Sequence, residues 1–242
     1  MDRWQFYRKS FTENISKDSN LLLISASENE INILRELGYN NFSITFHDIN
    51  NEKKLMEKGF IFNKNLFKSD IRNMKFENHS FDYVVTNATI HHVDLPHNAI
   101  TEMYRVSKKG VLIIESNDSL IVRLACKLNL AEEFEVSSVN EKQKLGGILD
   151  TGIPNYVYRW TEREIIKIIK SYDPLNINYI KFDYDNDLSN IKTKDNFLPD
   201  AFVKIVKLFA KIFFFIFKKQ QNCLSIFIDK TKSKKRWLNK YI

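Results

Sequence analysis

The 242-residue sequence predicts an α/β fold, a doubly wound sheet of seven mostly parallel strands. Two apolar runs, Phe81–Thr86 and Val111–Glu115, flank a stretch of helical period from about Leu95 to Ser107. Both runs are continuously apolar, which is typical of parallel strands that are covered on both faces. Parallel neighbours need a long crossover between them, and the helix supplies it.

The first part of the chain repeats this alternation of helices and short strands. Small residues, Ser25-Ala26-Ser27, follow the first strand, and Gly38 closes the next helix at the position of a left-handed cap. The expected elements are a helix over 3–15, a strand Leu21–Ile24, a helix Glu28–Leu37, a strand Phe42–Phe46, a helix over 51–58 and a weaker strand Asn65–Lys68.

The second part predicts a helix over Asp118–Asn129, with its leucines on one side, and then a long loop over 131–160. Thr161-x-x-Glu164 is a capping box that opens a helix to about Lys170. Ile177–Tyr184 and Asn222–Asp229 complete the sheet, with an amphipathic helix inserted between them. The expected division is a helix over 1–20, a core over 21–184 that includes the loop, the inserted helix within 185–221, and the last strand with a basic tail over 222–242.

The charge of the chain is unevenly placed. Residues 201–242 hold 11 Lys/Arg against one acid, whereas residues 1–200 hold 26 against 29. The core is therefore not basic, which makes nucleic acid an unlikely partner by charge. The first ten residues are charged and aromatic, so no secretory signal is expected there. Cys126 and Cys223 fit no metal spacing, and no metal site is expected.

Polar residues follow the ends of four predicted strands. In open α/β sheets, ligands bind where strands end at their carboxyl side. The small turn Ser25-Ala26-Ser27 lets a ligand approach the backbone, Asp48 can accept from a ribose diol, and Asp70 can accept from an exocyclic amine. Asn87 and the histidines follow the fourth strand. A lone strand-end aspartate is more often a turn or cap residue. The prediction of a ligand site therefore depends on all four strand ends carrying suitable residues in the right order.

The chain here resembles the class I S-adenosylmethionine-dependent methyltransferases over roughly residues 20–116. The resemblance is strongest in residues 69–116, which hold Asp70, the Phe81-Asp82-x-Val84 strand, the histidine turn and the helix end Glu102-x-x-Arg105-Val106-x-Lys108-x-Gly110. It implies a Rossmann-like fold and S-adenosyl-L-methionine as cofactor. By resemblance, Asp48 with Ile49 would hold the ribose, Asp70 with Ile71 the adenine, and Asn87 with Ala88 the methionine end.

One feature departs from that family. Its loop after the first strand is rich in glycine, whereas this chain has Ser25-Ala26-Ser27-Glu28-Asn29. A non-glycine residue is disfavoured at positive φ, and its Cβ occupies space next to the cofactor. Two outcomes follow: the loop still admits the cofactor, with Ser25, Ala26 and Ser27 in contact with it, or the domain has lost binding.

Methyl transfer needs an in-line nucleophile and, for a hydroxyl, removal of its proton. His91 and His92 are the candidate bases, because histidine titrates near neutral pH, although one of them can instead bond the turn. Asp94 is expected to cap the following helix. The expected acceptor residues follow the fifth strand and lie in the long loop: Glu115, Asp118, Arg123, Tyr156, Tyr158 and Arg159. The loop aromatics can equally serve as anchors to the core.

Residues 201–217 form the second distinctive feature, a helical pattern with a narrow lysine stripe on a broad apolar surface. Three lysines make it a poor membrane span, but it suits a helix lying at an anionic membrane surface, next to a basic tail. The alternative is a helix that covers the sheet edge or a dimer interface. The expected location is the cytoplasm, with peripheral attachment to the inner face of the cell membrane if this helix and the tail bind there.

The sequence and the resemblance therefore predict a methyltransferase for a small acceptor, sugar-like or lipid-linked. Residues 152–160 also resemble a stretch of methyltransferases found alongside bacterial surface-glycan enzymes, which implies a role in surface-glycan biosynthesis. The rival interpretation is a catalytically degenerate member of the fold that serves as a membrane-associated interaction module. The sequence leaves the acceptor, the methylated atom and the oligomeric state open.

Overall fold

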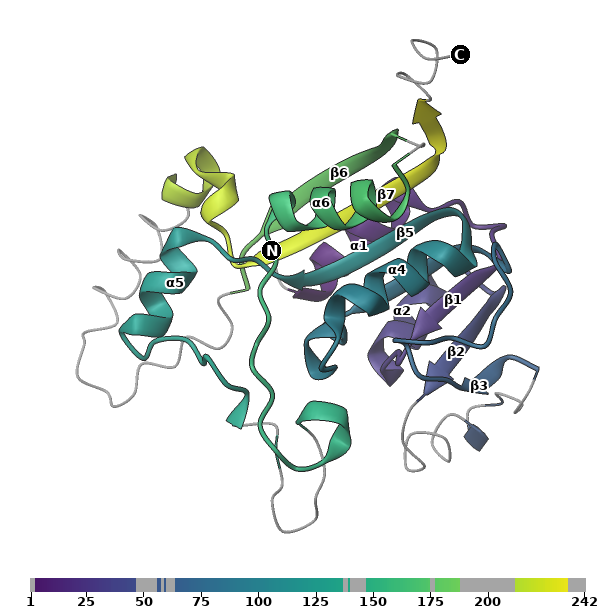
Figure 1. Ribbon diagram of the computed structural model, residues 1–242, viewed down its shortest axis with the longest axis horizontal. Helices are drawn as coiled ribbons and strands as arrows, with labels where there is room; N and C mark the ends of the chain where they lie inside the picture. The colour runs from purple at the N-terminus through teal and green to yellow at the C-terminus, as the bar shows by residue number, and fades with distance from the viewer. Residues whose placement is uncertain are drawn as a thin grey trace.

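The computed structural model describes residues 3–46, 56–57, 59, 64–136, 139, 147–174, 177–187 and 212–234. Seven strands form one sheet in the order β3-β2-β1-β4-β5-β7-β6 (Figure 1). They are β1 (Leu21–Ile24), β2 (Phe42–Phe46), β3 (Leu66–Lys68), β4 (Phe81–Asn87), β5 (Ser107–Ser116), β6 (Ile177–Asp185) and β7 (Cys223–Lys234). The predicted seven-stranded α/β fold is confirmed.

The sheet is parallel from β3 to β5, and only β7 runs antiparallel to its neighbours. β1 lies between β2 and β4, with Leu23 opposite both Ile44 and Val85. The topology reverses at β1, and this reversal places the ends of β1 and β4 side by side. In open sheets of this kind, the ligand crevice lies at that switch point.

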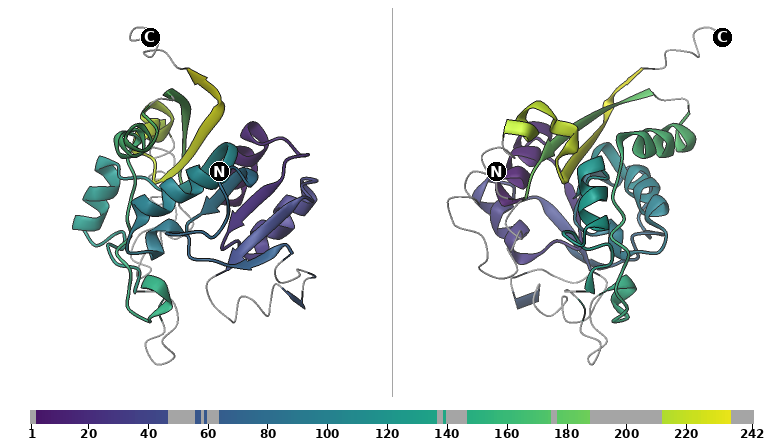
Figure 2. Two further views of the ribbon diagram at one scale, coloured as in Figure 1. Left: turned by 45° about the vertical axis from the view of Figure 1, so that its right-hand side comes forward. Right: turned by 90° about the vertical axis from the view of Figure 1, so that its left-hand side faces the viewer.

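Helices cover both faces of the sheet (Figure 2). They are α1 (Arg3–Asn14), α2 (Glu28–Glu36), α4 (Pro96–Val106), α5 (Leu120–Lys127) and α6 (Glu162–Tyr172), with short 3-10 turns η1 (Ile90–His92), η3 (Ile148–Asp150) and η4 (Lys218–Gln220). Alternate residues of each strand feed two separate cores, so Leu23 packs under α1 and α2 while Leu22 packs under α4 and α6.

The capping box predicted at the start of α6 is confirmed, and α2 begins with a second one that was not predicted. Ser27 caps α2 and Thr161 caps α6, each in a reciprocal capping box with Glu30 or Glu164. Gly38 takes φ of 86° just after α2, where a side chain would be strained. Asp94 does not cap α4, because Leu95 holds the cap position without a side-chain hydrogen bond.

The C-terminal strand β7 is a central part of the fold, since it lies between β5 and β6. Gly110 of β5 faces it so closely that a Cβ atom would lie 2.5 Å from the carbonyl oxygen of Ile228. Only glycine fits there without movement of the backbone. The pairing of β5 with β7 therefore depends on a glycine that the sequence places just before the apolar part of the strand.

The apolar side of α5 does not pack as its pattern suggests. Of its eight residues only Val122 is buried, while Leu120 is 69% exposed and Leu124 is 51% exposed. Residues 212–216 form a further short helical segment, with Phe215 and Ile216 exposed. Within the described part of the chain, no helix combines the length and the apolarity that crossing a membrane requires.

Three expectations lie outside the described residues: Asp48 with Ile49, most of the helix over 51–58, and the lysine stripe over 201–211.

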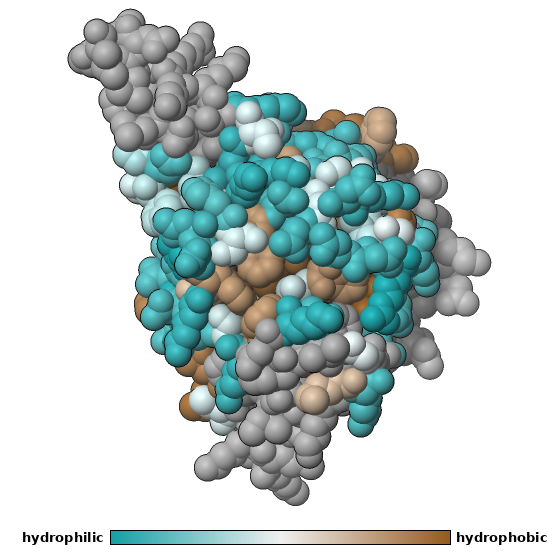
Figure 3. Space-filling view, turned by 90° about the vertical axis from the view of Figure 1, so that its right-hand side faces the viewer, coloured by the Kyte–Doolittle hydropathy of each residue, from teal (hydrophilic) through white to brown (hydrophobic). Residues whose placement is uncertain are grey.

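On the side of the molecule where β1 to β3 lie, the surface is mostly hydrophilic with a small apolar area near its centre (Figure 3).

Candidate active site

The turn after β1 holds a non-glycine residue in the left-handed region. Ser25 takes φ of 49°, and its backbone N–H donates to the carbonyl of Thr45 at 3.0 Å. This conformation costs a non-glycine residue about 1–2 kcal/mol. The loop thus adopts the geometry that a glycine would favour and accepts the strain, rather than taking an ordinary conformation.

The hydroxyl and the backbone N–H of Ser27, two residues further along the chain, already form hydrogen bonds within the protein. Its hydroxyl donates to Oε2 of Glu30 at 2.6 Å, and its backbone N–H donates to the same oxygen at 2.7 Å. The Ser27 hydroxyl is therefore a structural group here, and the predicted cofactor contact would fall mainly on Ser25 and the buried Ala26.

Glu30 links the ends of β1 and β4. Its side chain is 5% exposed, and burial raises its pKa, although hydrogen bonds from Ser27 and from the side chain of Asn87 lower it. Asn87, the last residue of β4, is buried as well. Two of the predicted cofactor regions, the serine loop and Asn87, are therefore brought together, through a residue that the sequence had not singled out.

The chain turns sharply after β4. Ala88 takes φ of 49°, and its N–H donates to the carbonyl of Ile114 at 2.8 Å. Glu115, at the end of β5, then accepts from the backbone N–H groups of Thr89 and Ile90 at 2.8 and 2.9 Å. Its other oxygen lies 2.7 Å from Nδ1 of His91. Glu115 is fully buried and holds the histidine turn, instead of facing open space as an acceptor contact would.

The two histidines differ in their electrostatics. Burial alone lowers the pKa of His91, but the charge and hydrogen bond of Glu115, with Glu135, outweigh it and raise the pKa to about 10. Burial and the charge of His91 lower the pKa of His92. His91 is therefore protonated near neutral pH and cannot accept a further proton, so of the predicted pair only His92 can act as a base.

Glu135, in the long loop, completes this cluster. Its Oε2 lies 3.6 Å from Nε2 of His91 and 3.5 Å from Nε2 of His92. The hydrogen bond with His91 lowers the pKa of Glu135, against the effect of burial. We call His91, His92 and Glu135 the histidine cluster.

Two segments of the long loop cross at this cluster. The N–H of Glu135 donates to the carbonyl of Asn155 at 3.0 Å, and the amide of Asn155 donates to the carbonyl of His91 at 3.2 Å. Phe134 pairs with Tyr156, their ring centroids 5.5 Å apart. Tyr156 remains 49% exposed beside the cluster, which suits an acceptor contact. The sequence could not have found Glu135 or Asn155, because they belong to a loop without periodicity.

Asp70 and its neighbours lie at the end of β3. Asp70 accepts three hydrogen bonds from the Arg72 guanidinium and one from its backbone N–H, while Ile71 is buried. The same guanidinium contacts Asp94 at 2.5 Å. Asp94, predicted as a helix cap, is thus an ion-pair partner instead, and Asp70 is held in a fixed position at the predicted adenine side.

The remaining predicted acceptor residues fall into two groups. Asp118 and Arg123 pair with each other at 2.5 and 2.9 Å on an exposed surface. Tyr158 donates to Glu164 and packs against the fully buried Trp160, so this part of the loop is an anchor to the core. Arg159 donates to the carbonyls of Val157 and Glu132, which ties the two loop segments together.

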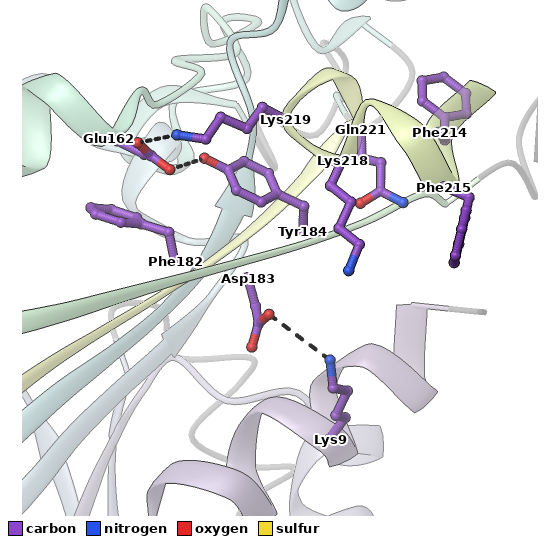
Figure 4. Close-up of a pocket in the computed structure, with 10 residues that line it drawn as sticks. All are labelled: Lys9, Glu162, Phe182, Asp183, Tyr184, Phe214, Phe215, Lys218, Lys219 and Gln221. Carbon is purple, nitrogen blue, oxygen red and sulfur yellow. Dashed lines mark hydrogen bonds and ion pairs between the residues drawn. The ribbon is translucent and has the colours of Figure 1, made fainter. Parts of the chain in front are cut away.

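A hollow of about 440 Å³ lies apart from this cluster (Figure 4). Glu162 at its rim accepts from Tyr184 and Lys219, and Lys9 pairs with Asp183 across it. Phe214 and Phe215 form another side. It is lined by aromatic rings and lysines, a combination that differs from the polar histidine cluster.

Comparison with known proteins agrees with this geometry. Residues 26–114 match the family model of a methyltransferase domain. The chain is similar to a solved structure from Haloferax volcanii, a complex of the Trm112 methyltransferase activator with a putative methyltransferase, at 14% identity and TM-score 0.56, covering 94% of this chain and 89% of that one. No curated protein matches the sequence.

Two further solved structures share the fold. A SAM-dependent methyltransferase from Archaeoglobus fulgidus has 13% identity and TM-score 0.53, with 94% of this chain and 91% of that one covered. A geranyl diphosphate C-methyltransferase from Streptomyces coelicolor, solved with Mg²⁺, geranyl diphosphate and S-adenosyl-L-homocysteine, has 8% identity and TM-score 0.53, with 94% and 80% covered.

The methyltransferase-domain match over residues 26–114, together with the shared fold, supports a SAM-dependent methyltransferase with S-adenosyl-L-methionine as its cofactor. The resemblance drawn from the sequence is thereby confirmed.

The residues at the switch point fit that cofactor. Among the described residues, Oδ1 of the buried Asn87 has no hydrogen-bond partner, so it is free to accept from an ammonium group. Ser25 and Ala26 lie on the neighbouring strand end. Asn87, Ala88 and the serine loop would hold the methionine part, and Asp70 with Ile71 the adenine. When bound, the cofactor supplies an activated methyl group on a sulfonium.

Proposed function

We propose that the protein methylates a hydroxyl of a small acceptor, sugar-like or lipid-linked, as in the synthesis of surface glycans. The observation that carries this is the position of the histidine cluster, which begins four residues after Asn87 and is enclosed by the long loop. The acceptor would bind between the cluster and the methionine end of the cofactor. Tyr156 offers an exposed ring suited to the face of a sugar.

The reaction is a displacement at the methyl carbon. The acceptor oxygen forms a bond to that carbon, the carbon–sulfur bond breaks with its electron pair going to sulfur, and the hydroxyl proton leaves the acceptor. The protein must align the oxygen and hold the site closed to water. The two loop segments that cross at Asn155 provide a cover over the cluster.

A methyl-transfer assay tests this proposal. Labelled cofactor is incubated with nucleotide sugars and lipid-linked saccharides, and transferred label is measured. His92→Ala should lose the activity at least about 100-fold, the usual contribution of an acid–base group. Arg163→Ala, an exposed position on α6, is the matched control. Transfer by the His92→Ala variant at the wild-type rate would contradict the placement of the acceptor.

A second proposal concerns the membrane surface, and exposed apolar residues support it. Leu120 and Leu124 of α5 and Leu128 just after it are exposed, and so are Phe215 and Ile216 of the segment before η4. The start of α5 and η4 are joined by hydrogen bonds from Ser119 and Ile121 to Gln220, so these two elements lie together at one end of the molecule (Figure 1). Lys218 and Lys219 are neighbours that anionic lipid would attract.

Vesicle flotation tests whether this surface binds a membrane. Removing residues 201–242 would also remove β7 from the sheet, so a Phe215→Ser/Ile216→Ser double variant is the cleaner probe. It should float less with anionic vesicles than wild type, whereas Met56→Ser, another exposed apolar position, should not. Equal flotation of all three would reject a membrane role for this surface. The interaction-module alternative, favoured by the serine loop, requires that the protein bind no cofactor.

A further inference from the structure

We propose that the histidine cluster is a binding site for a divalent transition-metal ion, with Nε2 of His91, Nε2 of His92 and a carboxylate oxygen of Glu135 as ligands. The three donor atoms lie within 4.8 Å of one another. That the protein binds a metal ion here does not depend on the proposed function. Only the role of the ion in methyl transfer rests on it.

The spacing of the donors fits such an ion. Ligands held at about 2.0–2.1 Å around a tetrahedral Zn²⁺ lie about 3.3 Å apart. The Glu135 oxygen is 3.6 Å from one histidine nitrogen and 3.5 Å from the other. The two imidazole rings have their centroids 4.4 Å apart and are tilted by 34°, so both can direct a nitrogen to one point with little movement.

The support behind His91 is of the kind that metal-bound histidines have. A histidine ligand usually donates its other ring nitrogen to a carboxylate, which fixes the ring and its tautomer. Here Nδ1 of His91 lies 2.7 Å from Glu115, and Glu115 is itself held by the N–H groups of Thr89 and Ile90. The Nε2 atom of His91 is thereby directed to Glu135, and an ion bound there would displace the proton that this nitrogen carries in the metal-free protein. Asn155 joins the backbones of His91 and the Glu135 segment.

The donor set indicates the metal and its accessibility. Two imidazoles and one carboxylate suit Zn²⁺ or a similar transition ion, whereas Mg²⁺ and Ca²⁺ prefer oxygen ligands. Three protein ligands leave a coordination position open, as in catalytic rather than structural sites. His92 is 34% exposed and Glu135 is 28% exposed, so the open position is reached from the surface.

At that position the metal would bind the acceptor hydroxyl. Binding to the ion lowers the pKa of the hydroxyl, so its proton passes to solvent water instead of to His92, which is then a metal ligand, and the oxygen remains as the nucleophile. The oxygen then bonds to the methyl carbon as the carbon–sulfur bond breaks, and S-adenosylhomocysteine leaves. The metal itself is neither oxidised nor reduced.

The test measures metal binding to untagged full-length protein that has been treated with a chelator and desalted. Titration with Zn²⁺ alone is followed by calorimetry, and Co²⁺ is added to a second sample for its visible absorption. We expect one ion per chain. His92→Ala and Glu135→Gln should each weaken Zn²⁺ binding at least tenfold, while His97→Ala and Glu133→Gln, exposed neighbours in the same segments, should not.

Binding of S-adenosylhomocysteine, the product that the cofactor leaves behind, is measured on the same samples. This measurement distinguishes a failure of the metal site from a failure of the proposed function. If the product binds but Zn²⁺ does not, or if Zn²⁺ binds equally to all variants, the metal site is overturned and the proposed methyl transfer stands. If Zn²⁺ binds in the expected way but the product does not, the metal site stands and the proposed function fails.

Discussion

Glu115 and His91 form a buried pair, with Oε2 of the carboxylate 2.7 Å from Nδ1 of the imidazole. The second carboxylate oxygen accepts from two backbone N–H groups of the turn, so one side chain at the end of β5 determines the shape of the chain after β4.

Glu115→Gln should therefore destabilise the protein. The substitution keeps the volume but removes the charge that His91 faces, and breaking a buried charge pair costs about 3–5 kcal/mol. Because glutamine can still accept from the backbone, we expect a loss of about 2–4 kcal/mol in the free energy of unfolding. Urea denaturation measures it. Glu133→Gln, an exposed control, should stay within about 0.5 kcal/mol of wild type, and equal stability of both variants would contradict the role of Glu115.

Ser25→Gly should stabilise the protein. Ser25 has φ of 49°, and glycine adopts this conformation without the penalty of a Cβ atom. We expect a gain of about 0.5–1 kcal/mol, whereas Ser25→Val should cost about 1–2 kcal/mol because a branched side chain is more strained there. Thermal unfolding of the two variants checks the prediction. A Ser25→Gly protein less stable than wild type would show that the hydroxyl matters more than the backbone strain.

Glu30 should make stability depend on pH. Burial raises its folded pKa above the ordinary value of 4.5, so between 4.5 and that raised value the folded protein binds more protons than the unfolded chain. The free energy of unfolding then falls as pH rises through this window, and the benefit present below 4.5 is lost above the raised pKa. The groups that act on Glu30 are Ser27, Asn87 and, by charge, Arg3.

Glu30→Gln removes this titration while keeping an acceptor for Ser27. Denaturation curves of wild type and variant from pH 4 to pH 8 should converge at the acidic end, and the variant should have the flatter profile. Parallel profiles would mean that Glu30 titrates alike in the folded and unfolded states.

Arg159→Ala should impair acceptor use more than cofactor binding. Its guanidinium donates to carbonyls of both loop segments over the histidine cluster. We expect a fall of about tenfold or more in kcat/KM for the acceptor, equivalent to about 1.4 kcal/mol, with the affinity for S-adenosylhomocysteine unchanged. Steady-state kinetics and calorimetry on the same preparation measure both. A matching loss of product affinity would count against this role.

The sheet could be predicted from the sequence because its strands are continuous apolar runs and because the capping box at Thr161 marks the start of α6. The burial of α5 could not be predicted in this way. Its leucines follow a helical period, but a period states only that one face is apolar, not that another element covers it. Whether Leu120 and Leu124 pack against anything depends on tertiary contacts that the pattern does not contain.

The site was predictable only in part, for a related reason. Asn87 and the histidines follow a strand, so the sheet itself brings them to one edge. Glu135 and Asn155 reach that edge through a loop whose path follows from individual hydrogen bonds. Glu30 shows the same limit, since its capping pattern with Ser27 was compatible with an exposed helix start, whereas the carboxylate is buried against Asn87.

Calorimetric titration of the full-length protein with S-adenosylhomocysteine tests most directly whether the serine-containing loop leaves room for the cofactor. The account predicts binding at one site per chain, weakened at least tenfold in an Asn87→Ala variant, which removes the buried oxygen that accepts from the ammonium group. An absence of binding heat and of any thermal shift at millimolar product would contradict it.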